Sequence, residues 1–185
     1  MILQNYTVGS DSDHGESGLA CDGGNWRLPV TVVYTTIEGT LAALDAAARL
    51  SKGLRAKIVL LVAEELAMYY PLDQPPGAAS FFEKVCRAII HDLHLEESAI
   101  RLEICFCRRQ VECFEAILSP RSLVVLGTKN RWWQRRERRL VRNLKVLGHD
   151  VVLVRPRAEG GHSQSVVQRL IDEDPESKWD KRNRA

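Results

Sequence analysis

The chain has 185 residues, of which 45% are hydrophobic and 27% charged, and its formal net charge is +2. This length suits one domain with a substantial core, and the composition is ordinary for a globular protein. A molecule that is basic overall is excluded, and no apolar run reaches the roughly 18 residues that a membrane-spanning helix needs. The start of the chain lacks the pattern of a secretory signal, and the five cysteines lie mostly in apolar segments. Both features favour a cytoplasmic location.

The first part of the chain changes character at residue 28. Residues 1–27 are rich in Gly, Ser and Asp and predict a flexible N-terminal arm. The β-branched run at 30–34 predicts the first strand. A helix follows, for which either Thr36 or Thr40 is a suitable N-cap, and Lys52-Gly53 is typical of a helix end with a C′ glycine.

The next two strands flank a second predicted helix. The apolar run at 57–62 predicts a buried strand, and a proline-rich loop follows it. Ser80 and Glu83 match a capping box, which predicts that the second helix begins at Ser80. The segment 100–107 alternates charged and apolar residues in its first half, which favours a strand at the edge of the sheet.

The rest of the regular pattern continues the alternation of strands and helices. The remaining predicted elements are a helix at 110–118, a strand at 122–126, a helix at 133–147 that ends at Gly148, and a strand at 150–154. Five strands alternating with four helices predict an α/β fold of three layers, in which a parallel sheet carries helices on both faces. The domain is expected to span 28–156, followed by a polar C-terminal tail at 157–185.

Several of these stretches resemble the universal stress protein family. The resemblance rests on VVYTTIEGTLAAL and AAARL in the first strand and helix, the strand at 57–64, LVVLGTK at 123–129, and the closing strand at 151–156. It implies a Rossmann-like five-stranded parallel sheet in the order 3-2-1-4-5. The ligand crevice of such a sheet lies where the strand order reverses, so Thr35 and Thr36 are expected to face Gly127 and Thr128.

The chain departs from the family's ATP-binding pattern. That pattern has an Asp and a Gly after the first strand and a G-x2-G-x9-G-[S/T] loop after the fourth. In this chain Thr35 and Thr36 replace the Asp and the Gly. In the loop Gly127 matches the first glycine, while the other positions of the pattern are occupied by Asn130, Leu140 and Val141. A phosphate loop needs glycines for close backbone approach and positive φ, which Leu140 and Val141 disfavour. We therefore expect no required cofactor, and the departures argue against ATP binding of the family's usual kind.

Three functions remain open at this stage. The first is a non-catalytic stress-response or signalling module that acts through a protein partner or, as the resemblance implies, through a homodimer formed by the fifth strand with Val152 and Val154. The second is a nucleotide or anion sensor that uses the crevice between the first and fourth strands. Its expected ligand-binding residues are Thr35, Thr36, Val62, Gly127, Thr128, Lys129, Asn130 and Arg131. A structural alternative is that Thr36 caps a helix and Thr128 satisfies the strand end.

The third function is a basic-surface adaptor for nucleic acid or an acidic partner. Eight basic residues and one acid lie between Lys129 and Lys145. Four of them recur at spacings of three and four and can form one helical stripe, namely Arg135, Arg138, Arg139 and Arg142. Such a run is most often a solvated helix face, but arginines can also grip phosphate groups. The preceding Trp132 and Trp133 either pack on the fold or stack on bases.

No residue pattern supports catalysis or a metal site. We find no arrangement of Ser, His and Asp or of Cys and His that is typical of a nucleophilic enzyme, and we expect the protein not to be an enzyme. Cys105 and Cys107 share one face of a strand, with Cys113 nearby. Buried reduced thiols explain this cluster better than a metal site, which would need further converging ligands.

Overall fold

A computed structural model describes residues 2–7, 29–54, 56–69, 72, 78–95, 100–128 and 135–156, with the backbone alone at 2–7, 78, 135 and 136. The helices are α1 (Ile37–Leu54), α2 (Ala78–Asp92), α3 (Gln110–Ile117) and α4 (Arg135–Val146). The strands are β1 (Ile2–Thr7), β2 (Val30–Val33), β3 (Ile58–Glu65), β4 (Ile100–Cys107), β5 (Leu123–Gly127) and β6 (Asp150–Val154). Within these residues, no helix combines the length and apolar character that crossing a bilayer requires.

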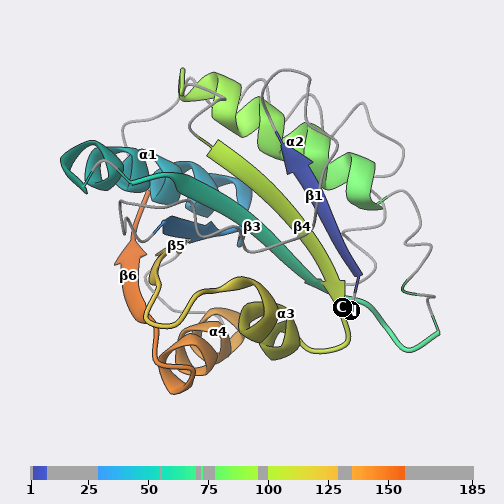
Figure 1. Cartoon of the computed structure of the whole chain (residues 1–185). Coiled ribbons are helices and arrows are strands. Elements are labelled where there is room, and N and C mark those ends of the chain that lie inside the picture. Colours follow the sequence, from blue (N-terminus) through green and yellow to red (C-terminus); the bar gives the residue numbers. More distant parts are fainter. Residues whose placement is uncertain are drawn as a thin grey trace, which may run out of the picture.

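The sheet has the predicted parallel core. Strands β4, β3, β2, β5 and β6 lie in that order and pair in parallel, which is the expected order 3-2-1-4-5. Helices α1 and α2 cover one face of the sheet, and α3 and α4 cover the other (Figure 1). The three-layer α/β prediction is therefore confirmed, and the order of the strands reverses between β2 and β5.

A sixth strand, β1, was not expected. It pairs antiparallel with β4, from Ile2 opposite Phe106 to Thr7 opposite Arg101 (Figure 1). The prediction of a flexible arm over 1–27 is wrong for residues 2–7, and residues 8–28 lie outside the described part of the chain. The outer edge of β4 would otherwise present unpaired N–H and C=O groups, which β1 satisfies. Strand β4 is consequently an inner strand and not the predicted sheet edge.

Two hydrophobic layers hold the sheet. Alternate side chains of the strands point to opposite faces, so Val30 and Val32 lie in the α1/α2 layer while Val33 lies in the α3/α4 layer. The α1/α2 layer includes Leu44 and Phe82, both buried. Full burial of such a side chain contributes about 1.5–3 kcal/mol, so these layers are the main source of stability.

The observed helix ends match those predicted from the sequence at two positions and differ from them at two. Thr36 caps α1, since its Oγ1 accepts a hydrogen bond from the Gly39 N–H at 3.1 Å. Gly148 ends α4 and has a φ of +84°. The Gly148 N–H donates to the Lys145 carbonyl and the His149 N–H to the Leu144 carbonyl, both at 3.0 Å. These two bonds form a Schellman motif.

The two predictions that differ concern Gly53 and the start of α2. Gly53 lies inside α1, which continues to Leu54, so it is not a C′ residue. Helix α2 begins at Ala78, two residues before the predicted N-cap Ser80. Glu83 therefore lies in the body of the helix, where it accepts a hydrogen bond from Arg87 Nε at 3.0 Å. Glu83 thus forms an i, i+4 pair with Arg87 and is not at position N3 of the helix.

Candidate functional site

The carboxyl ends of β2 and β5 meet where the strand order reverses, as the crevice prediction requires. Val33 and Leu126 are paired near the ends of these strands, and Thr35 and Gly127 follow them. The Thr35 hydroxyl donates a 2.7 Å hydrogen bond to the Gly127 carbonyl oxygen. The structure thus brings together two residues that were expected to bind a ligand, but their polar groups bond to each other.

The other threonines near this edge also have partners within the fold. The Thr40 Oγ1 accepts a 3.3 Å hydrogen bond from the Thr35 N–H, while Thr36 serves as the N-cap of α1. Thr128 is buried, and its N–H donates to the Val154 carbonyl at 2.9 Å. Each threonine therefore has a local structural role, which is the alternative that the sequence left open.

The first turn of α1 lies directly on the end of β5. A Cβ atom added to Gly39 would stand 2.7 Å from the Gly127 carbonyl oxygen and 2.8 Å from Thr35 Oγ1. A Cβ atom added to Gly127 would collide with the backbone of Gly39. Gly127 is thus needed for close packing between a helix and a strand, whatever other role it has. At this contact the Thr35 hydroxyl and the Gly127 carbonyl satisfy each other.

The remaining expected ligand residues are Val62 and three residues that follow Thr128. Val62 is buried in the α1/α2 layer, with its side chain among core residues. Lys129, Asn130 and Arg131 lie outside the described residues. Among the residues the structure describes, Thr35 and Gly127 are the predicted ligand residues joined by a side-chain hydrogen bond.

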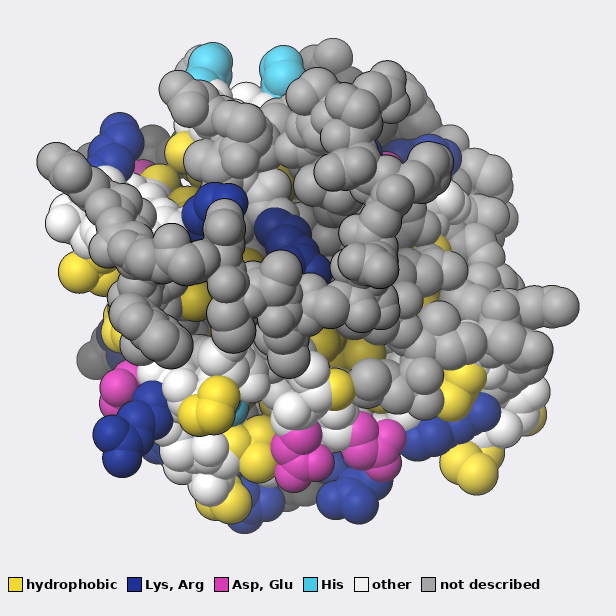
Figure 2. Space-filling model, viewed as in Figure 1, with side chains coloured by type: hydrophobic (Ala, Val, Ile, Leu, Met, Phe, Trp, Pro, Cys, Tyr) yellow, Lys and Arg dark blue, Asp and Glu magenta, His cyan; other side chains and the backbone are white. Residues whose placement is uncertain are grey.

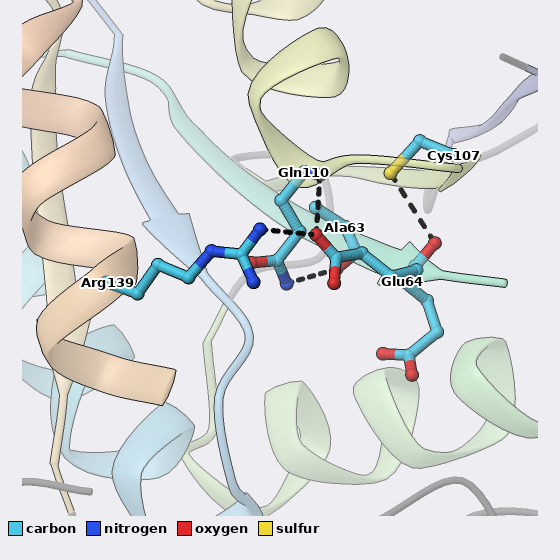
Figure 3. Close-up of polar contacts among 6 residues, drawn as sticks. Ala63, Glu64, Cys107, Gln110 and Arg139 are labelled. Atoms are coloured by element: carbon cyan, nitrogen blue, oxygen red, sulfur yellow. Dashed lines mark hydrogen bonds and ion pairs between the residues drawn. The ribbon is translucent and has the colours of Figure 1, made fainter. Parts of the chain in front are cut away.

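A second polar cluster at the same edge was not predicted. Glu65, at the end of β3, accepts a 3.0 Å hydrogen bond from the Gln110 N–H through its Oε1. Arg139 on α4 lies on the other side, with Nη2 4.0 Å from the same oxygen (Figure 3). Arg109 is the N-cap residue of α3 and makes no side-chain cap bond. Glu65 therefore supplies a carboxylate cap to α3 from a neighbouring strand.

Three further hydrogen bonds join the end of β3 and the residues after it to the start of α3. Gln110 Nε2 donates to the Ala63 carbonyl at 2.9 Å (Figure 3). Arg108 donates to the carbonyls of Leu66, at 3.2 Å, and of Ala67. The Glu64-Glu65 pair at the end of a buried strand was the sequence signal for this cluster. Its partners could not be found from the sequence, because they come from elements more than forty residues away.

The three clustered cysteines lie in the α3/α4 layer and are buried. Cys105, Cys107 and Cys113 form no disulfide, and Cys107 Sγ donates to the Glu64 carbonyl at 3.5 Å (Figure 3). Hydrogen bonding to Cys105, together with burial, raises the pKa of the Cys107 and Cys113 thiols. The same contacts lower the pKa of Cys105. Within the described part of the chain no group of three or more His, Cys, Asp and Glu side chains is arranged to hold a metal ion.

The predicted basic stripe and the predicted dimer edge are both at the surface. Arg138, Arg139 and Arg142 are exposed on α4, while the side chain of Arg135 is outside the described atoms. On β6, Val152 is 37% exposed and Val154 is partly buried against the α1/α2 layer. Strand β6 pairs with β5 on one side and ends the described sheet on the other.

Comparisons with known proteins do not assign the chain to a family. No protein-family model matches the chain, and a search of curated proteins finds no matching relative.

Proposed function

We propose that this chain is a non-catalytic stress-response or signalling module that acts by pairing its β6 edge with a second copy, without needing a bound nucleotide. The observation that carries the proposal is the contact among Thr35, Gly39 and Gly127, where a ligand would otherwise sit. Because these groups satisfy one another, a nucleotide would have to displace a helix turn from a strand end. The stress-response part of the proposal rests on the resemblance of the chain to universal stress proteins.

Strand β6 supports the assembly part of the proposal. Its outer backbone groups have no pairing strand within the described residues, and an open edge of this kind is a template for another strand. Val152 stands at the centre of β6 and is a large apolar side chain exposed there. An antiparallel pair centred on Val152 would place the two copies of this side chain opposite each other, where β-branched pairs are stabilising.

The mass of the protein in solution tests the assembly. Light scattering at micromolar concentration is expected to give a dimer for the wild type and a monomer for Val152→Lys. The control is Met68→Lys, since Met68 is 81% exposed just after β3, and strands β2 and β5 separate β3 from β6. That control is expected to remain dimeric. A monomeric wild type, or a dimer that survives Val152→Lys, would overturn pairing through β6.

A thermal-shift titration tests the nucleotide part. ATP and ADP at millimolar concentration are expected to leave the melting temperature unchanged, because a ligand stabilises a protein only as far as it binds the native state. A saturable rise of several degrees that persists at physiological salt would contradict the proposal. The chain would then be the nucleotide sensor that the sequence left as its second function.

A further inference from the structure

The outer face of α4 carries positive charge without a neutralising acid of its own. Leu140, Val141 and Leu144 point inward and are buried in the α3/α4 layer. The single acid of the helix, Glu137, is also buried. The charged side chains that the structure describes as exposed on α4 are all cations, namely Arg138, Arg139, Arg142 and Lys145.

These cations are available for an external partner. Within the described residues, Arg138, Arg142 and Lys145 have no ion-pair partner, and Arg139 reaches Glu65 only at 4.0 Å with 60% of its side chain exposed. Acidic side chains also lie along this edge of the molecule (Figure 2), and α3 next to α4 carries Glu112 and Glu115.

The spacing of the cations places them in a line along the helix. Arg138, Arg142 and Lys145 follow one another at i, i+4 and i+7, which is one stripe of a helix and about 10 Å long. Such a stripe can meet successive negative groups of a linear polymer. A compact anion would engage only one or two of these side chains at a time.

The chemistry of this face selects a nucleic acid among polymeric anions. Asn143 is the one other described polar residue beside the cations, and Leu140, Val141 and Leu144 are turned into the core. Val146, at the very end of the helix, is the one exposed apolar side chain among the described side chains of α4, which is too little for an apolar face. A membrane-surface helix needs an outward apolar face, and a protein interface usually has aromatic or aliphatic anchors at its centre. Arginine forks fit phosphate oxygens in pairs, and lysine binds them as a point charge.

We propose that the outer face of α4 binds the phosphate backbone of a nucleic acid without preference for sequence. This function goes beyond the pairing of β6 and does not depend on it, because the residues involved lie on the solvent face of a different element. Binding through a few phosphate contacts releases condensed counterions, so the affinity must fall steeply with salt.

Fluorescence anisotropy of a labelled single strand of about 16 nucleotides tests the proposal. For the wild type, four cations give an expected slope of log Kobs against log salt of about −3 between about 50 and 200 mM. The triple variant Arg138→Gln, Arg142→Gln, Lys145→Gln is expected to bind about tenfold or more weakly, with a slope close to about −1. The changed side chains are exposed, so circular dichroism is expected to show an unchanged fold.

A matched control removes the same charge from the opposite face. Lys52, Lys57 and Lys84 are exposed on α1, before β3 and on α2, and their triple change to Gln is expected to keep the affinity and the slope. Equal losses in both triple variants would show that only net charge matters and would overturn the assignment to α4. So would the absence of binding at about 50 mM salt, where phosphate contacts are strongest. Binding to anionic lipid vesicles or polyglutamate at equal or higher affinity would overturn the choice of nucleic acid.

Discussion

The backbone of Gly39 in the first turn of α1 lies directly against the backbone of Gly127 at the end of β5. A Cβ atom on Gly39 would stand 2.7 Å from the Gly127 carbonyl oxygen, closer than such atoms approach in folded proteins. This contact fixes the helix to the strand end at the point where parallel α/β sheets usually bind their ligands. The two glycines therefore hold the first turn of α1 against the end of β5.

The glycine contact predicts a reversal of the usual effect of alanine in a helix. Gly39→Ala is expected to destabilise the protein by about 1–3 kcal/mol, because the added methyl group displaces packed backbone. Gly53→Ala in the same helix is the control, since nothing lies within 4 Å of a Cβ atom there. It is expected to stabilise by about 0.5–1 kcal/mol through reduced backbone entropy. Urea unfolding measures both, and a stabilising Gly39→Ala would show that the contact is loose.

The hydrogen bond from Thr35 to Gly127 gives a second prediction. Thr35→Val keeps the shape of the side chain but leaves the Gly127 carbonyl without its 2.7 Å donor, and the expected loss is about 1–3 kcal/mol. Thr35→Ser retains the hydroxyl and is expected to cost clearly less. Comparison of the two variants by urea unfolding isolates the hydrogen bond. If they are equally stable, the bond contributes nothing and the hydroxyl is free to serve a ligand.

The parallel strands and their helices could be predicted because each is long enough to show its own pattern, whereas the order of the strands in the sheet was implied by the resemblance to universal stress proteins. The run at 123–126 and the Schellman glycine Gly148 are local signals, and the structure has both where they were expected. Strand β1 could not be predicted, because six residues before a Gly- and Ser-rich stretch form a strand only when the edge of β4 is present to pair with them. The cap that Glu65 supplies to Gln110 is likewise a tertiary contact between distant elements.

The two contacts of Glu65, with the Gln110 N–H and with Arg139, are expected to differ in strength. Glu65→Ala removes the carboxylate cap of α3 and is expected to cost about 1 kcal/mol. Arg139→Ala removes only a long, exposed ion pair and is expected to cost less than about 0.5 kcal/mol. Thermal and urea unfolding of both variants measure the difference. Equal losses would mean that the ion pair, and not the cap, is the stabilising contact, and would also reduce the number of α4 cations available to a partner.

The raised pKa of the buried Glu103 carboxyl predicts that stability falls with rising pH. Burial raises the pKa of this carboxyl, although Arg101, whose Nε lies 2.9 Å from Oε1, lowers it in part. A carboxyl with a raised pKa binds its proton more tightly in the folded state than in the unfolded state. The free energy of unfolding therefore decreases as pH rises above the unfolded value of about 4.3, towards the folded pKa. Glu103→Gln is expected to lack this decrease when melting temperatures are measured across the range, and an unchanged profile would refute the assignment.

His149 follows Gly148 at the end of α4. Its burial predicts that stability rises with pH, which is the opposite of the effect of Glu103, and over a slightly higher pH range. Its Nδ1 is buried and has no hydrogen-bond partner in the described structure, and burial lowers the pKa of the ring. The folded state then binds a proton less readily than the unfolded state, so stability is complete above the unfolded pKa of about 6.5 and is lost as pH falls below it. His149→Phe keeps an aromatic ring that cannot take up a proton, and its melting temperature is expected to fall less than that of the wild type on acidification from about pH 7 to pH 5. A variant that retains the full wild-type loss would show that another group accounts for the sensitivity to acid.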